Sequence, residues 1–93
     1  MPRLIKVTGV SMAPTVNAGD YLLTIKPRTF RAGLIYVMEH ERHGRIVKRL
    51  ADVNADMASY ESDNPEGSSG EIATAKITSR AWLAITPKGI KRL

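Results

Sequence analysis

The sequence contains no cysteine among its 93 residues. This absence excludes a disulfide framework and any metal site built from thiolates. The two histidines, His40 and His43, are three residues apart in a turn-like segment and lack the i, i+4 spacing of a helical zinc-protease motif. We therefore expect no metal site, and we expect both histidines to be exposed. Nothing in the sequence implies an organic cofactor.

Long hydrophobic runs are also missing. No stretch reaches the roughly 18 apolar residues that a membrane-spanning helix requires, and residues 1–6 lack the apolar centre of a signal peptide. We therefore expect a soluble, cytoplasmic protein without a membrane anchor. The length of 93 residues predicts one domain, 1–93, with a small and compact core.

Acidic residues are outnumbered, because 9 Asp and Glu against 14 Lys and Arg give a formal net charge of +5. Such an excess can attract nucleic acid or an anionic membrane surface. The sequence has, however, no helix-turn-helix pattern, no basic helix and no basic stretch with interleaved aromatic residues. We interpret Lys88, Lys91 and Arg92 as solvated surface charge, and nucleic acid is not an expected partner.

What the sequence does contain is a series of short apolar or alternating runs, none of which keeps a helical period. Pro, Gly, Asn and Asp separate these runs, as is typical of strands joined by tight turns. The pattern predicts an all-β domain of antiparallel strands in which residues 34–50 form a hairpin. The predicted strands are Leu4–Thr8, Tyr21–Lys26, Leu34–Glu39, Arg45–Leu50, Met57–Tyr60 and Glu71–Ile85.

Two segments far apart in the sequence carry candidate chemistry. Residues 9–15, Gly-Val-Ser-Met-Ala-Pro-Thr, place Ser11 in a tight turn, and residues 45–50, Arg-Ile-Val-Lys-Arg-Leu, place Lys48 in a strand. Strand side chains alternate, so Lys48 shares an apolar face with Ile46 and Leu50. Burial lowers the pKa of a lysine, and a neutral amine can accept the proton of a serine hydroxyl. An ordinary lysine whose amine reaches water while its stem packs on the strand fits the same pattern.

The two segments together resemble the LexA/signal-peptidase superfamily of Ser/Lys peptidases. In that superfamily the nucleophile lies in a Gly-x-Ser-Met-x-Pro-Thr segment, a Gly-Asp pair follows, and the base lysine lies in a Val-Lys-Arg strand. This sequence has those residues in the same order at 9–15, 19–20 and 47–49. Residues 62–65, Ser-Asp-Asn-Pro, resemble the downstream Gly/Ser-Asp-Asn element. The resemblance implies a fold of coiled antiparallel sheets that is partly barrel-like.

The resemblance also implies a serine endopeptidase that hydrolyses a specific peptide bond through an acyl-enzyme. Ser11 would be the nucleophile and its backbone N–H an oxyanion donor, while Lys48 would be the general base, so we expect Ser11 Oγ and Lys48 Nζ within hydrogen-bond reach. Met12 is either a core residue or a contact for small substrate side chains. Ser68, four residues after Asn64, is either a loop serine or the group that orients the amine of Lys48, because signal peptidases carry such a serine there.

The expected partner is a polypeptide substrate that pairs in an extended conformation with a sheet edge. The resemblance implies small residues such as Ala or Gly beside the cleaved bond. Unpaired edges around the site also predict a homodimer when no such segment is bound. The alternative function is a regulatory module of the LexA-like or phage-repressor type, which dimerises and cleaves itself or nothing. Because only ten residues precede Ser11, we expect neither a DNA-binding domain nor a long cleavable arm before it.

Overall fold

The computed structural model of the protein describes residues 2–93. Apart from one short 3₁₀ helix, the regular structure of these residues is β-strand, so the all-β prediction is confirmed. No helix within residues 2–93 has the length and apolar character needed to cross a membrane. In chain order the elements are β1 (Arg3–Lys6), β2 (Tyr21–Ile25), β3 (Ile35–His40), β4 (Gly44–Asn54), β5 (Met57–Glu61), β6 (Gly70–Ala73), η1 (Thr74–Lys76), β7 (Ile77–Thr86) and β8 (Gly89–Arg92).

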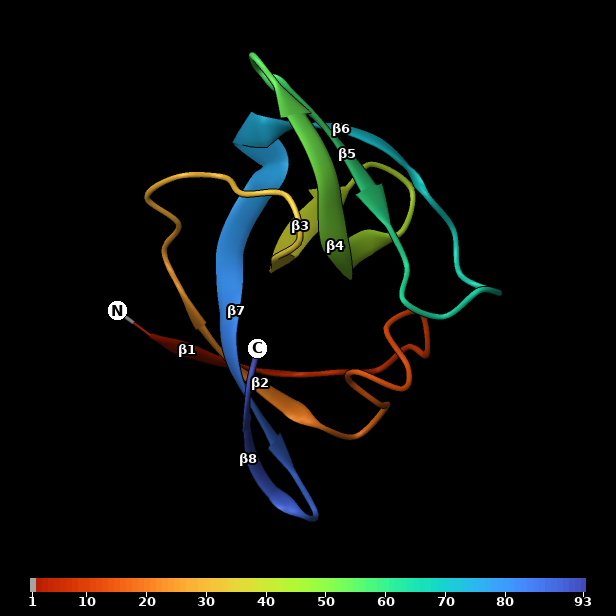
Figure 1. Cartoon of the computed structure of the whole chain (residues 1–93), viewed down its shortest axis with the longest axis vertical. Coiled ribbons are helices and arrows are strands. Elements are labelled where there is room, and N and C mark those ends of the chain that lie inside the picture. The colour runs from red at the N-terminus through yellow and green to blue at the C-terminus, as the bar shows by residue number, and fades with distance from the viewer. Residues whose placement is uncertain (1) are drawn as a thin grey trace.

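The strands form one antiparallel sheet that curls into a half-barrel (Figure 1). The strand order is β1-β2-β7-β3-β4-β5-β6, and β8 also pairs with β7. β7 joins the two halves of the sheet: one of its edges pairs with β2, and the other pairs first with β3 and then with β8. In Figure 1 it runs between the group β3–β6 and the group β1, β2 and β8. The coiled, partly barrel-like fold is therefore confirmed.

The positions of the first five strands agree with the sequence prediction, although β1 ends at Lys6, two residues earlier than predicted, and β4 continues to Asn54, four residues further. The predicted hairpin over residues 34–50 is confirmed as β3 and β4. The single strand predicted for residues 71–85 is wrong, because η1 divides it into β6, which pairs with β5, and β7. The backbone N–H of Thr74 donates to the carbonyl of Asp56 at 2.9 Å, and this contact turns the chain away from β5. The structure also adds β8, which the sequence reading did not predict.

The core consists of two clusters of buried side chains, and β3 contributes to both because its residues alternate between the two faces of the sheet. Ile35 belongs to the first cluster and the neighbouring Tyr36 to the second. The segment around Ser11 packs on the first cluster through Met12, whereas β4 packs on the second through Leu50. The first cluster contains Val7, Met12, Val16, Leu22, Ile35, Ala81 and Ala84, and the second contains Tyr36, Met38, Leu50, Ala58, Tyr60, Ile72 and Ile77.

Candidate active site

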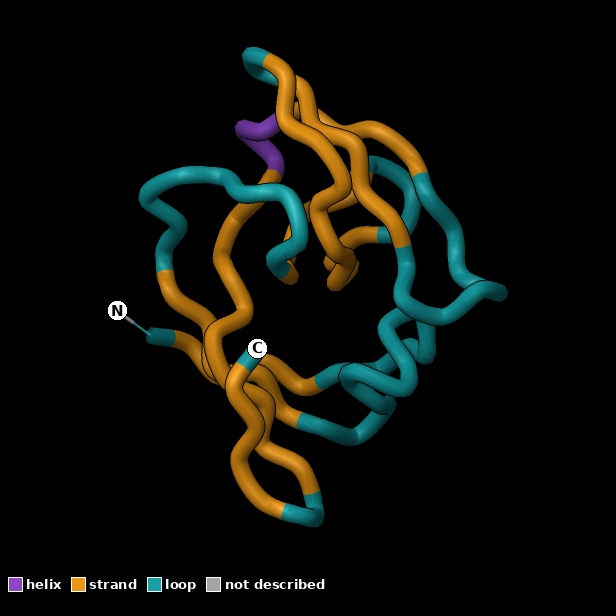
Figure 2. The backbone as a smooth tube through the Cα atoms, viewed as in Figure 1, coloured by secondary structure: helices purple, strands orange, loops and turns teal. Residues whose placement is uncertain are grey.

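Three segments that are far apart in the sequence meet at one side of the molecule. They are the nucleophile turn (residues 9–15), strand β4, and the loop 62–69 between β5 and β6. Figure 2 shows the loop before β2 and the loop before β6 running next to each other. The backbone N–H of Asn64 donates to the carbonyl of Ser11 at 2.9 Å, and Asn64 Nδ2 donates to the carbonyl of Val10 at 3.0 Å. The loop therefore holds the turn that carries the candidate nucleophile.

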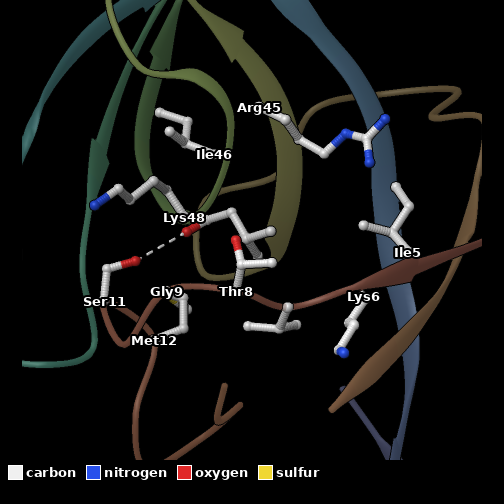
Figure 3. Close-up of a pocket in the computed structure, with 11 residues that line it drawn as sticks. Ile5, Lys6, Thr8, Gly9, Ser11, Met12, Arg45, Ile46 and Lys48 are labelled. Atoms are coloured by element: carbon white, nitrogen blue, oxygen red, sulfur yellow. Dashed lines mark hydrogen bonds between the residues drawn. The ribbon is translucent and has the colours of Figure 1, made fainter. Parts of the chain in front are cut away.

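A cleft of about 150 Å³ separates the end of β1 and the nucleophile turn from the first half of β4. Ser11 and Lys48 lie at one end of this cleft and Lys6 and Arg45 toward the other, as Figure 3 shows. No Asp or Glu lines it. The lining residues are Ile5, Lys6, Val7, Thr8, Gly9, Ser11, Met12, Arg45, Ile46, Val47 and Lys48.

Lys48 is buried, with only 5% of its surface exposed, as the strand alternation predicted. Its ammonium donates to Ser62 Oγ at 2.7 Å and to Ser68 Oγ at 3.3 Å. The centroid of the Tyr60 ring lies 6.0 Å from the amine. Burial lowers the pKa of Lys48 below its ordinary value of 10.5, because removal from water disfavours the charged form. The buried site thus supplies the property that a lysine base needs.

The hydroxyl of Ser11 is turned toward β4. Its Oγ donates to the carbonyl of Val47 at 3.5 Å, a long contact drawn as a dashed line in Figure 3. Within residues 2–93 no hydrogen bond joins Ser11 Oγ to Lys48 Nζ, so the expected direct contact is not made in this conformation. The amine of Lys48 instead donates to the hydroxyls of Ser62 and Ser68. No hydrogen bond within the described chain engages the backbone N–H of Ser11, which leaves that donor free for a ligand.

Asp63 links the nucleophile turn to the strand that carries Lys48. Its Oδ1 accepts from Arg49 Nε at 2.8 Å and its Oδ2 from Arg49 Nη2 at 2.7 Å, while Thr15 Oγ1 donates to Oδ2 at 2.6 Å. The hydrogen bonds from Arg49 hold the pKa of Asp63 below its ordinary value of 3.8, and the same pair raises the pKa of Arg49. Arg49 Nη1 also donates to the carbonyl of Gly33 at 2.5 Å.

The structure thus brings together Ser11, Lys48 and Ser68, and Ser68 contacts the amine rather than lying free in its loop. Met12 is 1% exposed, packs in the first cluster and also borders the cleft, so its role in substrate binding stays a prediction. Sequence reasoning gave no role to Ser62, which is the nearest partner of the amine. The sequence feature that could have pointed to Ser62 is its position in the Ser-Asp-Asn element. A Cβ on Gly67 would lie 2.4 Å from Ser62 Cβ, so glycine there leaves space for Ser62.

The two histidines lie in the turn between β3 and β4. Their rings stack with centroids 4.7 Å apart, which leaves His43 exposed and His40 half-buried. Full exposure was therefore predicted correctly for His43 alone. Within residues 2–93 no group of three or more His, Asp or Glu side chains is placed to hold a metal ion.

Comparison with family models places the chain in a known family. The family model described as Peptidase S24-like matches residues 3–84. This range includes the nucleophile turn, strand β4 and the loop 62–69, the three segments that meet at the cleft. The search of curated proteins found no match.

Proposed function

The chain belongs to the Peptidase S24-like family, and we propose that this serine-peptidase-type or LexA-like domain is an active endopeptidase, with Ser11 as nucleophile and Lys48 as general base. One observation carries the proposal: a buried amine with a lowered pKa lines the same cleft as a serine hydroxyl. A hydroxyl needs a neighbouring base to become a nucleophile near neutral pH, and a desolvated lysine can be that base.

Ser62 and Ser68 orient the base in this proposal. Ser62 Oγ donates its own proton to the carbonyl of Ser68 at 2.6 Å, so its lone pairs accept from the amine. A neutral Lys48 then directs one N–H to Ser62 and the other to Ser68. Its lone pair is left to accept the proton of Ser11.

The substrate pairs with the free edge of β4. Residues 44–48 pair with β3 on one side, whereas the pairing of β4 with β5 begins only at Arg49. The carbonyl of Val47 faces the cleft, since Ser11 Oγ donates to it. An extended polypeptide that donates a backbone N–H to this carbonyl displaces the Ser11 hydroxyl, which is then free to turn toward Lys48. Small substrate residues beside the scissile bond fit a cleft of about 150 Å³.

The reaction proceeds in two stages. Ser11 Oγ transfers its proton to Lys48 Nζ and attacks the scissile carbonyl carbon, while the N–H of Ser11 donates to the developing oxyanion. The C–N bond breaks as Lys48 returns the proton to the leaving amine. Lys48 then activates a water that hydrolyses the acyl-enzyme and frees Ser11.

The pH dependence of cleavage tests this proposal. Since the pKa of Lys48 is lowered by burial, the neutral amine is present at a lower pH than for an exposed lysine. We expect kcat/KM to rise with pH and to level off above the lowered pKa. Cleavage is measured with a library of extended peptides that contain Ala and Gly, with products identified by mass spectrometry. A rate that is flat or falls over the interval from pH 6 to 10 contradicts a lysine base.

Ser62→Ala tests how the base is held. Removal of the 2.7 Å contact takes away an acceptor that favours the ammonium, so the pKa of Lys48 falls further. We expect the rise in kcat/KM to move to lower pH, and the high-pH plateau to fall about 10-fold because the lone pair loses its orientation. Ser69→Ala, an exposed serine in the same loop, is the matched control and should leave the profile unchanged. A purely structural role for Ser62 would lower the plateau without moving the profile.

A second candidate is the non-catalytic or self-cleaving regulatory module. The capture of Lys48 by Ser62 and Ser68, away from Ser11, is the observation that favours it. A homodimer would then cover the exposed apolar residues of the outer sheet face, among them Leu4 (58% exposed) and Ile90 (71% exposed). Sedimentation separates the candidates: a stable dimer that cleaves no peptide at any pH supports the module. A cytoplasmic location stays a prediction under both.

A further inference from the structure

A second depression, of about 260 Å³, lies under the loop 26–34 that connects β2 to β3. It shares no lining residue with the cleft described above, and its role does not depend on the proposed peptidase activity. The lining residues are Ile25, Lys26, Pro27, Arg28, Thr29, Arg31, Leu34, Tyr36 and Arg80.

The lining carries four cationic side chains and no carboxylate. Lys26, Arg28 and Arg31 come from the loop, and Arg80 comes from β7. Residues 2–93 contain a single ion pair, between Arg49 and Asp63. None of the four cations therefore forms an ion pair with an acidic side chain of the described residues. Like charges gathered without a counter-charge repel each other, and a bound anion relieves that repulsion.

Arg80 adds an independent observation. Its Nε is buried and has no hydrogen-bond partner within the described residues. The residue is in register with Ile25 of β2 and with Tyr36 of β3, so the sheet fixes its backbone on both edges. A buried N–H without an acceptor costs roughly 1–3 kcal/mol, and more when the group is charged. Such a donor in a cationic depression indicates that an acceptor binds there.

The loop above Arg80 is tied to the core. The hydroxyl of Tyr36, a residue with no exposed surface, accepts from the backbone N–H of Arg31 at 3.0 Å and donates to the carbonyl of Thr29 at 3.3 Å. The backbone N–H of Gly33 donates to the carbonyl of Leu50 at 2.8 Å. Arg28 and Arg31 therefore project from a loop whose backbone is held at several points.

We propose that this depression binds a phosphate group, either as inorganic phosphate or as the monoester of a small molecule. Three guanidinium groups offer paired N–H donors that match the oxygens of a tetrahedral oxyanion, and Lys26 adds a fourth positive charge. The Nε of Arg80 is a buried donor of this set, whereas Lys26, Arg28 and Arg31 are exposed residues. A single water could accept from Nε but would leave four charges uncompensated, so an anion fits the lining better than water does.

The test is a ¹H–¹⁵N NMR titration of the whole chain with inorganic phosphate at constant ionic strength, with chloride as the replaced salt. We expect saturable shifts of the Arg80 Nε–Hε signal and of the amides of residues 26–34. Arg28→Gln and Arg31→Gln change exposed loop residues that do not support the sheet, and each should weaken binding about 5- to 10-fold. Arg80→Gln should abolish the shifts. Arg92→Gln, which removes one exposed charge on β8, is the matched control and should retain the affinity within twofold.

Two further titrations decide what is bound. Glycerol phosphate that binds more tightly than inorganic phosphate identifies a monoester site, and the reverse order identifies a site for the free ion. Acetate that binds as tightly as phosphate overturns the assignment to phosphate. Shifts that do not exceed those of chloride, or an affinity for phosphate that is unchanged in both Arg28→Gln and Arg31→Gln, overturn the site as a whole and leave a buried water as the partner of Arg80.

Discussion

Ser11→Ala and Lys48→Ala should each reduce kcat/KM by roughly 1000-fold or more, because neither group can act without the other. The double variant should be no worse than either single variant, since the proton transfer between the two is already lost. Lys48→Arg should be equally inactive, because a guanidinium does not deprotonate in this pH range. Cleavage of the best library peptide is measured for the wild type and the four variants at the pH of the wild-type plateau.

The controls separate lost chemistry from lost folding. Ser69→Ala and Lys76→Ala alter an exposed serine and an exposed lysine outside the cleft, and both should cleave at the wild-type rate. Thermal melts of the Ser11 and Lys48 variants should show a folded domain. Lys48→Ala should not be strongly destabilised at neutral pH, because it removes a buried ammonium whose charge the fold disfavours. Wild-type cleavage by either folded alanine variant would refute the mechanism.

Asp63→Asn should lower both the stability and the activity. It weakens two charge-assisted hydrogen bonds from Arg49 and one from Thr15, and the pair is only partly exposed, with 28% and 16% of the two side chains accessible. We expect a loss of about 1–3 kcal/mol in the free energy of unfolding. For a chain of this size that is a drop of roughly 4–8 °C in Tm for each kcal/mol.

The activity of Asp63→Asn should fall further than its stability explains, because this carboxylate positions the nucleophile turn against the strand of Lys48. We expect kcat at a temperature where the variant is fully folded to fall about 10-fold, with KM little changed. Glu71→Gln, an exposed carboxylate on β6, is the matched control. A variant that is destabilised but has wild-type kcat would show that Asp63 acts on stability alone.

The free energy of unfolding should decrease in acid as Asp63 becomes protonated. Since the pKa of Asp63 in the folded protein lies below the ordinary value of 3.8, the stability that its ionised form contributes is present above that value and is lost as the pH falls through the lowered pKa. Asp63→Asn removes this part of the acid loss. Lys48 also makes the protein more stable as the pH rises. Because its pKa is lower in the folded protein, the unfolded chain binds more protons, and the contribution of Lys48 to stability increases as the pH rises toward 10.5.

The sequence predicted what local patterns determine. Alternation within β4 predicted that Lys48 is buried, and the resemblance to Ser/Lys peptidases implied that the segments of Ser11 and Lys48 lie at one site. It did not predict the break at Thr74, because residues 71–77 contain no Gly, Pro, Asn or Asp to indicate a turn. The contact that turns the chain comes from Asp56, in the turn between β4 and β5. The sequence pattern also did not predict which serine hydroxyl accepts from the amine of Lys48. That depends on the path of an irregular loop, and Ser62 lies nearer to the amine than Ser68 does.

The position of β7 determines when the two halves of the sheet can join during synthesis of the chain. β2 and β3 follow each other in the chain but do not pair; each pairs instead with β7, which lies more than 40 residues beyond the start of β3. Until β7 has left the ribosome, the hairpin β1–β2 and the meander β3–β6 have no strand in common. The nucleophile turn packs with the first and Lys48 belongs to the second. A nascent chain therefore carries both groups before the strand that joins their two halves of the sheet is available, and the slow closure of this long-range pairing delays completion of the cleft until β7 has been synthesised.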